Sequence, residues 1–133
     1  MSQENIVAQN QTIILTTGIY DLIKDHIRRK KVNALQENLL KLQLKYATQV
    51  PRRNLPSNVV SIDTRVTVKD YYSDREDTYT FVAPAKAKMK NNTLSILSPM
   101  GLALVGFKEG DIVSWVFDDR VRQMEILKVE RLD

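Results

Sequence analysis

The sequence predicts an α+β fold: a short antiparallel helical hairpin (coiled coil), followed by a twisted antiparallel β-sheet with one short helix. In the first third of the chain, apolar residues recur at helical spacing. After Pro51 and Pro56 they alternate instead, as they do in strands. A chain of 133 residues can build one compact core, or a small core with an appendage. We therefore expect an N-terminal segment with the hairpin over 1–54 and a globular domain over 55–133.

The first predicted helix begins near Ile19, after a short apolar run at 12–15, with Thr16 or Thr17 as its capping hydroxyl. The cations that follow it suit the negative end of a helix dipole. Its apolar face is formed by residues at helical spacing: Ile19, Leu22, Ile23, His26 and Ile27.

The second predicted helix starts after Asn33, which forms a capping-box pattern with Gln36, and runs to about Gln49. Because only about three residues join the two helices, they must be antiparallel. The two prolines then favour an extended linker. The apolar stripe of this helix follows a 4-3-4 spacing: Leu35, Leu39, Leu42 and Tyr46.

The remainder of the chain predicts strands and one helix of about two turns. Ser98 is the expected cap of that helix, Pro99 its first residue and Gly106 its end, with 100–105 between them. A turn at Gly110 precedes the last antiparallel pair. The expected strands are 59–62, 65–69, 78–82, 93–97, 112–117 and 121–132, with a turn at 73–77, a basic loop through Lys86, Lys88 and Lys90, and a turn at 118–120.

Composition excludes several classes of protein. There is no cysteine, so neither a disulfide framework nor a thiolate zinc site is available. No run approaches the roughly 20 apolar residues of a membrane helix, and the N-terminus lacks the order of a signal peptide. We expect a cytoplasmic protein that makes no contact with a membrane.

Charge is unevenly distributed along the chain. Residues 17–54 hold nine Lys or Arg against three Asp or Glu, a difference of +6, whereas 55–133 hold eleven against twelve. Four adjacent cations mark the expected hairpin tip: Arg28, Arg29, Lys30 and Lys31. They suit contact with nucleic-acid phosphates or with an acidic protein surface, and equally suit a solvated helix end.

The sequence predicts no catalytic residue, no metal site and no cofactor. His26 lies in an apolar stripe without a nucleophile or carboxylate pattern, which favours packing. The acids Asp74, Glu76 and Asp77 fall in a predicted turn, and no glycine-rich phosphate loop occurs. The strand aromatics are expected to fill the core or cover a sheet face: Trp115, Tyr71, Tyr72 and Tyr79.

Residues 94–113, with the pattern S-P-x-G-x-A-L-x-G followed by G-D-x-V, resemble the C-terminal domain of the Gre transcription elongation factors. The segments 63–68 and 82–85 stand in the order and spacing of that domain, so the resemblance covers about 55–133. It implies an FKBP-like sheet that cradles the short helix. The short hairpin resembles that of the Rnk-like branch (regulator of nucleoside diphosphate kinase), since Gre factors carry a much longer coiled coil.

This resemblance implies a non-catalytic regulator of elongation that binds bacterial RNA polymerase. Ser98, Pro99 and Met100 would dock on the coiled-coil rim of the secondary channel, although Leu97 stands where some Gre factors have a polar residue. A hairpin of about 15 residues reaches roughly 22 Å, about half the reach of a Gre coiled coil. Its cationic tip would repel a divalent ion, so we expect binding without stimulation of transcript cleavage. We also expect a monomer and non-specific nucleic-acid contact only through the complex.

The sequence is compatible with two other functions. The FKBP-like fold suggests a prolyl isomerase, which would need an apolar pocket lined by aromatic residues, but a fold is weak grounds for function. The Rnk-like branch suggests a protein-interaction module that regulates nucleoside diphosphate kinase.

Overall fold

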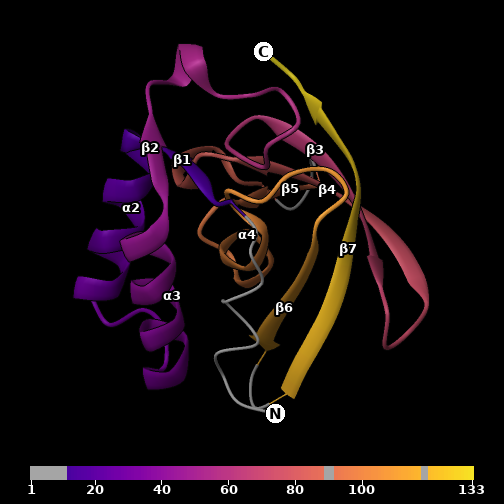
Figure 1. The fold of residues 1–133 in the computed structure, drawn as a ribbon, viewed down its shortest axis with the longest axis horizontal. Coiled ribbons are helices and arrows are strands. Elements are labelled where there is room, and N and C mark those ends of the chain that lie inside the picture. The colour runs from indigo at the N-terminus through magenta and orange to yellow at the C-terminus, as the bar shows by residue number, and fades with distance from the viewer. Residues whose placement is uncertain (1–11, 89–91, 118–119) are drawn as a thin grey trace.

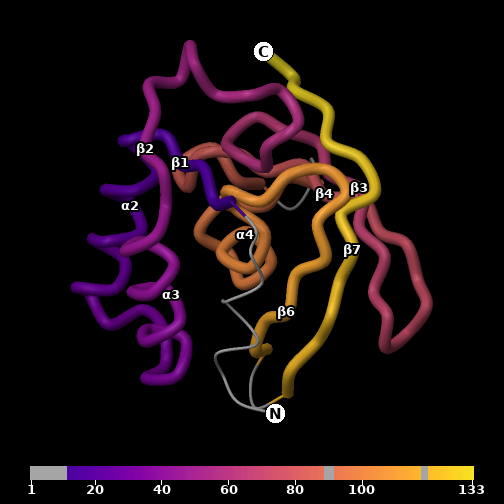
Figure 2. Tube along the Cα trace, in the orientation of Figure 1, coloured from indigo at the N-terminus to yellow at the C-terminus, as the bar shows by residue number. Residues whose placement is uncertain are grey.

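The computed structural model describes residues 12–88, 92–117 and 120–133. Helices α2 (Thr17–Arg28) and α3 (Ala34–Tyr46) lie side by side along one side of the molecule, and a five-stranded sheet lies on the other (Figure 1). The short helix α4 (Pro99–Leu104) lies between them, as the chain trace also shows (Figure 2). Buried side chains from all three parts form one continuous core. The helical hairpin is therefore packed against the rest of the fold.

The predicted helix caps are confirmed. Thr16 caps α2, its hydroxyl accepting from the Ile19 N–H at 3.2 Å. Asn33 and Gln36 form the capping box of α3. The turn between the helices is closed by Lys30, whose φ of 57° places it in the left-handed region where glycine is usual. Helix α2 begins at Thr17, two residues before its predicted start.

Helix α3 ends at Tyr46, so its predicted extension to Gln49 is wrong. Strand β2 (Thr48–Val50) follows and pairs in parallel with β1 (Ile14–Thr16), which forms where the sequence showed only a short apolar run. The backbone of Thr48 pairs with β1 and therefore does not continue the helix. The two short strands close the base of the hairpin.

The predicted apolar stripe of α3 is confirmed at Leu39, which is buried, and at Leu35, which packs against the core, but its second half is wrong. Leu42 is 40% exposed and Tyr46 is 71% exposed. The buried residues of this helix are Leu39, which belongs to the predicted stripe, and Leu40, Gln43 and Leu44, which do not. A 4-3-4 seam would serve two helices that contact only each other, whereas α3 faces the shared core beneath the hairpin as well.

The large sheet has the strand order β5-β4-β3-β7-β6 and is mixed. Three of its pairs are antiparallel, but β5 runs parallel to β4, so the expectation of a wholly antiparallel sheet is wrong at this edge. Its strands are β3 (Thr64–Asp70), β4 (Arg75–Val82), β5 (Thr93–Ser95), β6 (Ile112–Phe117) and β7 (Arg120–Arg131). The α+β class and the curled sheet around one short helix are confirmed.

Two further segments differ from the predictions. Residues 59–62 form no strand; Val59 makes a single bridge to Lys108, and the Val60 N–H donates to the Phe107 carbonyl at 2.8 Å. This segment supports the exit of α4. Strand β4 begins at Arg75, so the acids at 76 and 77 lie in a strand that faces β3, because the turn before it is shorter than expected.

The linker at 51–56 contains a 3-10 turn, η1 (Arg52–Asn54), and a second such turn, η2 (Pro84–Lys86), precedes β5. Lys90 and the turn residues 118 and 119 lie outside the described residues. Among the helices described, none is long and apolar enough to cross a membrane.

Candidate functional site

The start of α4 is built as the sequence predicts. The Ser98 hydroxyl accepts from the Gly101 N–H at 3.2 Å, and Pro99 is the first helical residue. Pro99 is exposed, while Ser98 and Met100 are half-buried. The helix beyond them is buried. Only its first turn therefore offers a surface to a partner.

A tight turn fixes the position of this helix start. The Ser98 N–H donates to the Ser95 carbonyl at 2.9 Å, and the Leu97 N–H donates to the Ser95 hydroxyl at 3.0 Å. Ile96 is fully buried, and its N–H donates to the Val82 carbonyl at 2.9 Å. The loop is thus anchored to β4 by its backbone and to the core by the side chains of Ile96 and Leu97.

The basic tip of the hairpin is partly neutralised by acids that the sequence interpretation did not assign to it. Arg28 and Arg29 both contact the Asp25 carboxylate, the Arg29 pair at 2.9 Å. Lys30 contacts Glu37 at 3.2 Å. The side chains of these three cations remain 65 to 77% exposed, so the ion pairs contribute little to stability.

Glu37 also contacts Lys41, at 3.1 Å. The hydrogen bond from Lys41, followed by that from Lys30, holds the pKa of the Glu37 carboxyl below its usual value. One carboxylate therefore bridges the tip of the hairpin and the second turn of α3.

The four predicted tip cations do not share one surface. Lys31 lines a small cavity of about 90 Å³ whose wall also includes Pro99, His26 and Trp115. Nearby, the Gln36 side chain donates to the Val116 carbonyl at 3.3 Å, which ties α3 to β6. The sequence did not predict that the hairpin tip and the start of α4 meet.

His26 lies in the wall of this cavity and is half-buried. Burial is the main reason why its pKa is lowered, and the nearby Lys31 charge adds to this effect, while Asp25 opposes it. The neutral imidazole is therefore favoured at the interface of hairpin and core.

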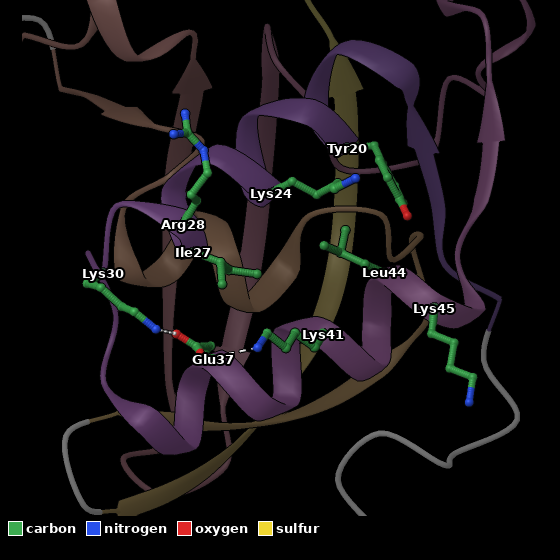
Figure 3. A pocket seen from close by; sticks show the side chains of 9 residues that line it. All are labelled: Tyr20, Lys24, Ile27, Arg28, Lys30, Glu37, Lys41, Leu44 and Lys45. Carbon is green, nitrogen blue, oxygen red and sulfur yellow. Dashed lines mark hydrogen bonds and ion pairs between the residues drawn. The ribbon is translucent and has the colours of Figure 1, made fainter.

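Arg28 and Lys30 line a different and larger hollow between α2 and α3, with a volume of about 620 Å³ (Figure 3). We call it the interhelical groove. This groove was not predicted from the sequence, although two pairs of cations stand one helical turn apart there, Lys24 with Arg28 and Lys41 with Lys45. The groove is rimmed by cations and is unlike the apolar aromatic pocket that a prolyl isomerase would need.

Within the described residues, no three His, Cys, Asp or Glu side chains lie close enough together to hold a metal ion. The acids nearest the tip, Asp25 and Glu37, are each held by two cations.

Comparison with known proteins identifies relatives of most of the chain. Residues 55–131 match the family "Transcription elongation factor, GreA/GreB, C-term". Curated relatives include the transcription elongation factor GreA of Clostridium beijerinckii and that of Clostridium botulinum, each 42% identical over 92 residues. These alignments cover 69% of this chain but only 58% of each relative.

A solved structure of a prokaryotic transcription elongation factor GreA/GreB from Nitrosomonas europaea has the same fold, with a TM-score of 0.63 and 23% identity. The match covers 90% of this chain and 98% of that one. The family match spans the large sheet and α4, including the turn that fixes Pro99. The chain belongs to the GreA/GreB family of transcription elongation factors, through residues 55–131, which match the C-terminal part of that family.

Proposed function

We propose that the chain is a non-catalytic regulator of transcription that docks on bacterial RNA polymerase through the start of α4. The observation that supports this most directly is the exposed Pro99 at the head of an otherwise buried helix, inside the segment that matches the family. A rigid apolar surface of this kind loses little conformational freedom on binding. Its expected partner is the coiled-coil rim of the polymerase secondary channel, which places its action in the bacterial cytoplasm.

The hairpin supports the second part of the proposal, binding without stimulation of transcript cleavage. Helix α2 has 12 residues, which correspond to about 18 Å, and its inner face is committed to the core by Ile19, Ile23 and Ile27. A short hairpin held against the domain cannot extend far into a channel. Its tip also carries cations whose nearest acids are already paired, so it is poorly suited to attract a divalent metal ion.

The first experiment measures binding of labelled protein to bacterial core RNA polymerase, with unlabelled GreA as competitor. We expect competition, and we expect Pro99→Ala to weaken binding roughly tenfold, as loss of a central contact does. Pro84→Ala is the matched control, because Pro84 is also an exposed proline at the first position of a short helical turn. Absence of binding at micromolar concentration, or equal effects of the two substitutions, would reject the docking site.

The second experiment adds the protein to backtracked polymerase complexes. We expect no shortening of the transcript, and slower shortening by GreA when both proteins are present. Shortening by this protein alone would contradict the proposal. Three points stay predictions: the assignment to the Rnk-like branch, the separation of 1–54 from 55–133 as domains, and the monomeric state.

A further inference from the structure

The interhelical groove has a regular arrangement of positive charge. Lys24 and Arg28 stand one turn apart on α2, and Lys41 and Lys45 stand one turn apart on α3. Lys30 adds a fifth cation at the hairpin tip. Cations from both helices therefore line one hollow, and Lys24 and Lys41 extend along it from opposite sides (Figure 3).

Between the rows the groove is apolar. Ile27 and Leu44 line it, and both are largely buried, at 7% and 8% exposure. Tyr20 lines the groove as well and is half-buried. A ligand that fits this surface needs an apolar ridge between flanking negative charges.

Glu37 shows what kind of group the rim attracts. It is the one acid among the described residues that line the groove, its side chain is 15% exposed, and Lys30 and Lys41 approach it from two sides (Figure 3). The described lining residues hold five cations and one carboxylate, a charge difference of 5 − 1 = +4, and Asp25, outside the lining, pairs with one of the five, Arg28. The Glu37 carboxylate thus already occupies part of the position beside Lys30 and Lys41 that a carboxylate of a ligand would take.

Two of the cations have no acidic partner within the described residues. Lys24 lies over the ring of Tyr20 at 5.7 Å, and Lys45 lies over the ring of Tyr46 at 5.5 Å. Neither takes part in an ion pair with the residues described. As far as the described part of the chain goes, both ammonium groups can pair with carboxylates of a partner.

We propose that the interhelical groove binds an acidic amphipathic helix of a partner protein, as a third helix against α2 and α3. Carboxylates one turn apart on such a helix match cations one turn apart on each wall, and its apolar side chains cover Ile27 and Leu44. The sugar-phosphate backbone of a nucleic acid can pair with the cations, but it has no apolar ridge that would pack against Ile27 and Leu44. This site is separate from the start of α4, whose Pro99 lines the other cavity.

The test uses the full chain and a labelled synthetic peptide of about 18 residues, long enough to be partly helical in water, with Leu on one face and Glu beside it. We expect saturable binding by fluorescence anisotropy. The double substitution Lys24→Glu with Lys45→Glu should weaken it at least about tenfold, because two attractions become repulsions. Lys86→Glu with Lys88→Glu is the matched control, since it changes the charge equally at exposed sites outside the groove, and should leave binding unchanged.

Glu37→Gln gives a second readout with the opposite sign. It removes the internal carboxylate, frees Lys30 and Lys41, and should tighten peptide binding about threefold. Circular dichroism of each variant checks that the helices persist.

Three results would overturn the proposal. The first is equal loss of binding in the groove and control double variants. The second is equal affinity for a peptide with every Leu replaced by Ser, since the floor would then contribute nothing. The third is tighter binding of a single-stranded RNA of the same net charge, abolished by the groove substitutions, which would assign the groove to nucleic acid instead. None of these results depends on whether the chain binds RNA polymerase.

Discussion

Gly101 lies directly against the carbonyl group of Ile96: a β-carbon on Gly101 would lie 2.7 Å from the carbonyl carbon of Ile96 and 2.8 Å from the carbonyl oxygen of Ser95. Both neighbours are backbone atoms, which cannot rotate away. This contact sets the distance between the first turn of α4 and the turn that precedes it. The position of Pro99 therefore depends on the absence of a side chain two residues later.

We predict that Gly101→Ala lowers the free energy of unfolding by about 1–3 kcal/mol, the usual cost of overpacking a core position. Gly18→Ala is the control, because a β-carbon there meets no atom within 4 Å. In helix α2 it should stabilise the protein by about 0.5–1 kcal/mol. Urea denaturation of both variants measures the two effects, and equal changes would show that the close approach is not present in solution.

A second prediction distinguishes the buried face of α3 from the stripe that the sequence suggested. Leu40 is 1% exposed and Leu42 is 40% exposed. Leu40→Ala should cost about 2–5 kcal/mol, because it leaves a cavity in the core. Leu42→Ala should cost about 0.5 kcal/mol or less. Thermal or urea unfolding compares them, and a larger loss at Leu42 would restore the seam predicted from the 4-3-4 spacing.

The features that could be predicted from the sequence are those that depend on a few neighbouring residues. A hydroxyl or amide before a helix caps it wherever the helix is packed, which is why Asn33 and Ser98 were identified correctly and Thr16 was one of the two candidates for the cap of α2. The same holds for Gly106, whose φ of +88° ends α4.

The features that were missed depend on contacts between distant segments. The parallel pair of β1 and β2 joins residues 34 apart in the chain, such as Ile14 and Thr48. No local sequence pattern indicates a pairing between segments so far apart. The direction of β5 is likewise set by its crossover and not by its own residues. The interhelical groove requires both helices in place before its cations share a surface, although their spacing could be read in each helix alone.

A third prediction concerns the contact between the N-terminal strand and the C-terminal domain. A β-carbon on Gly106 would lie 2.6 Å from Cγ2 of Ile13 and 2.8 Å from Cδ2 of Leu15, whereas one on Gly110 meets nothing within 4 Å. Both glycines have positive φ, so alanine at either site carries about 1–2 kcal/mol of backbone strain.

Gly106→Ala should therefore cost at least about 1 kcal/mol more than Gly110→Ala, because buried side chains must also move. Equilibrium unfolding of both variants gives the difference. If the two losses are the same, β1 does not pack on the exit of α4, and the hairpin is held less firmly than the structure indicates.

The last prediction is a dependence on pH. Asp70 has an 8% exposed side chain, contacts Arg122, and accepts from the N–H groups of Tyr72 at 2.8 Å and Ser73 at 3.4 Å. Burial is the largest single influence on its pKa and raises it. The hydrogen bonds from Arg122 and the two backbone groups together outweigh burial, so the pKa of Asp70 lies below its usual value.

A carboxyl whose pKa is lower in the folded than in the unfolded protein stabilises the fold above the unfolded pKa, near about 4, and this contribution is lost as pH falls through the folded value. Asp70→Asn retains the shape but loses the charged partner of Arg122. It should cost about 1–3 kcal/mol at neutral pH. Urea unfolding of both proteins over a series of pH values should show this difference shrinking below about pH 4. A difference that stays constant down to pH 3 would mean that the ionised form of Asp70 does not stabilise the fold.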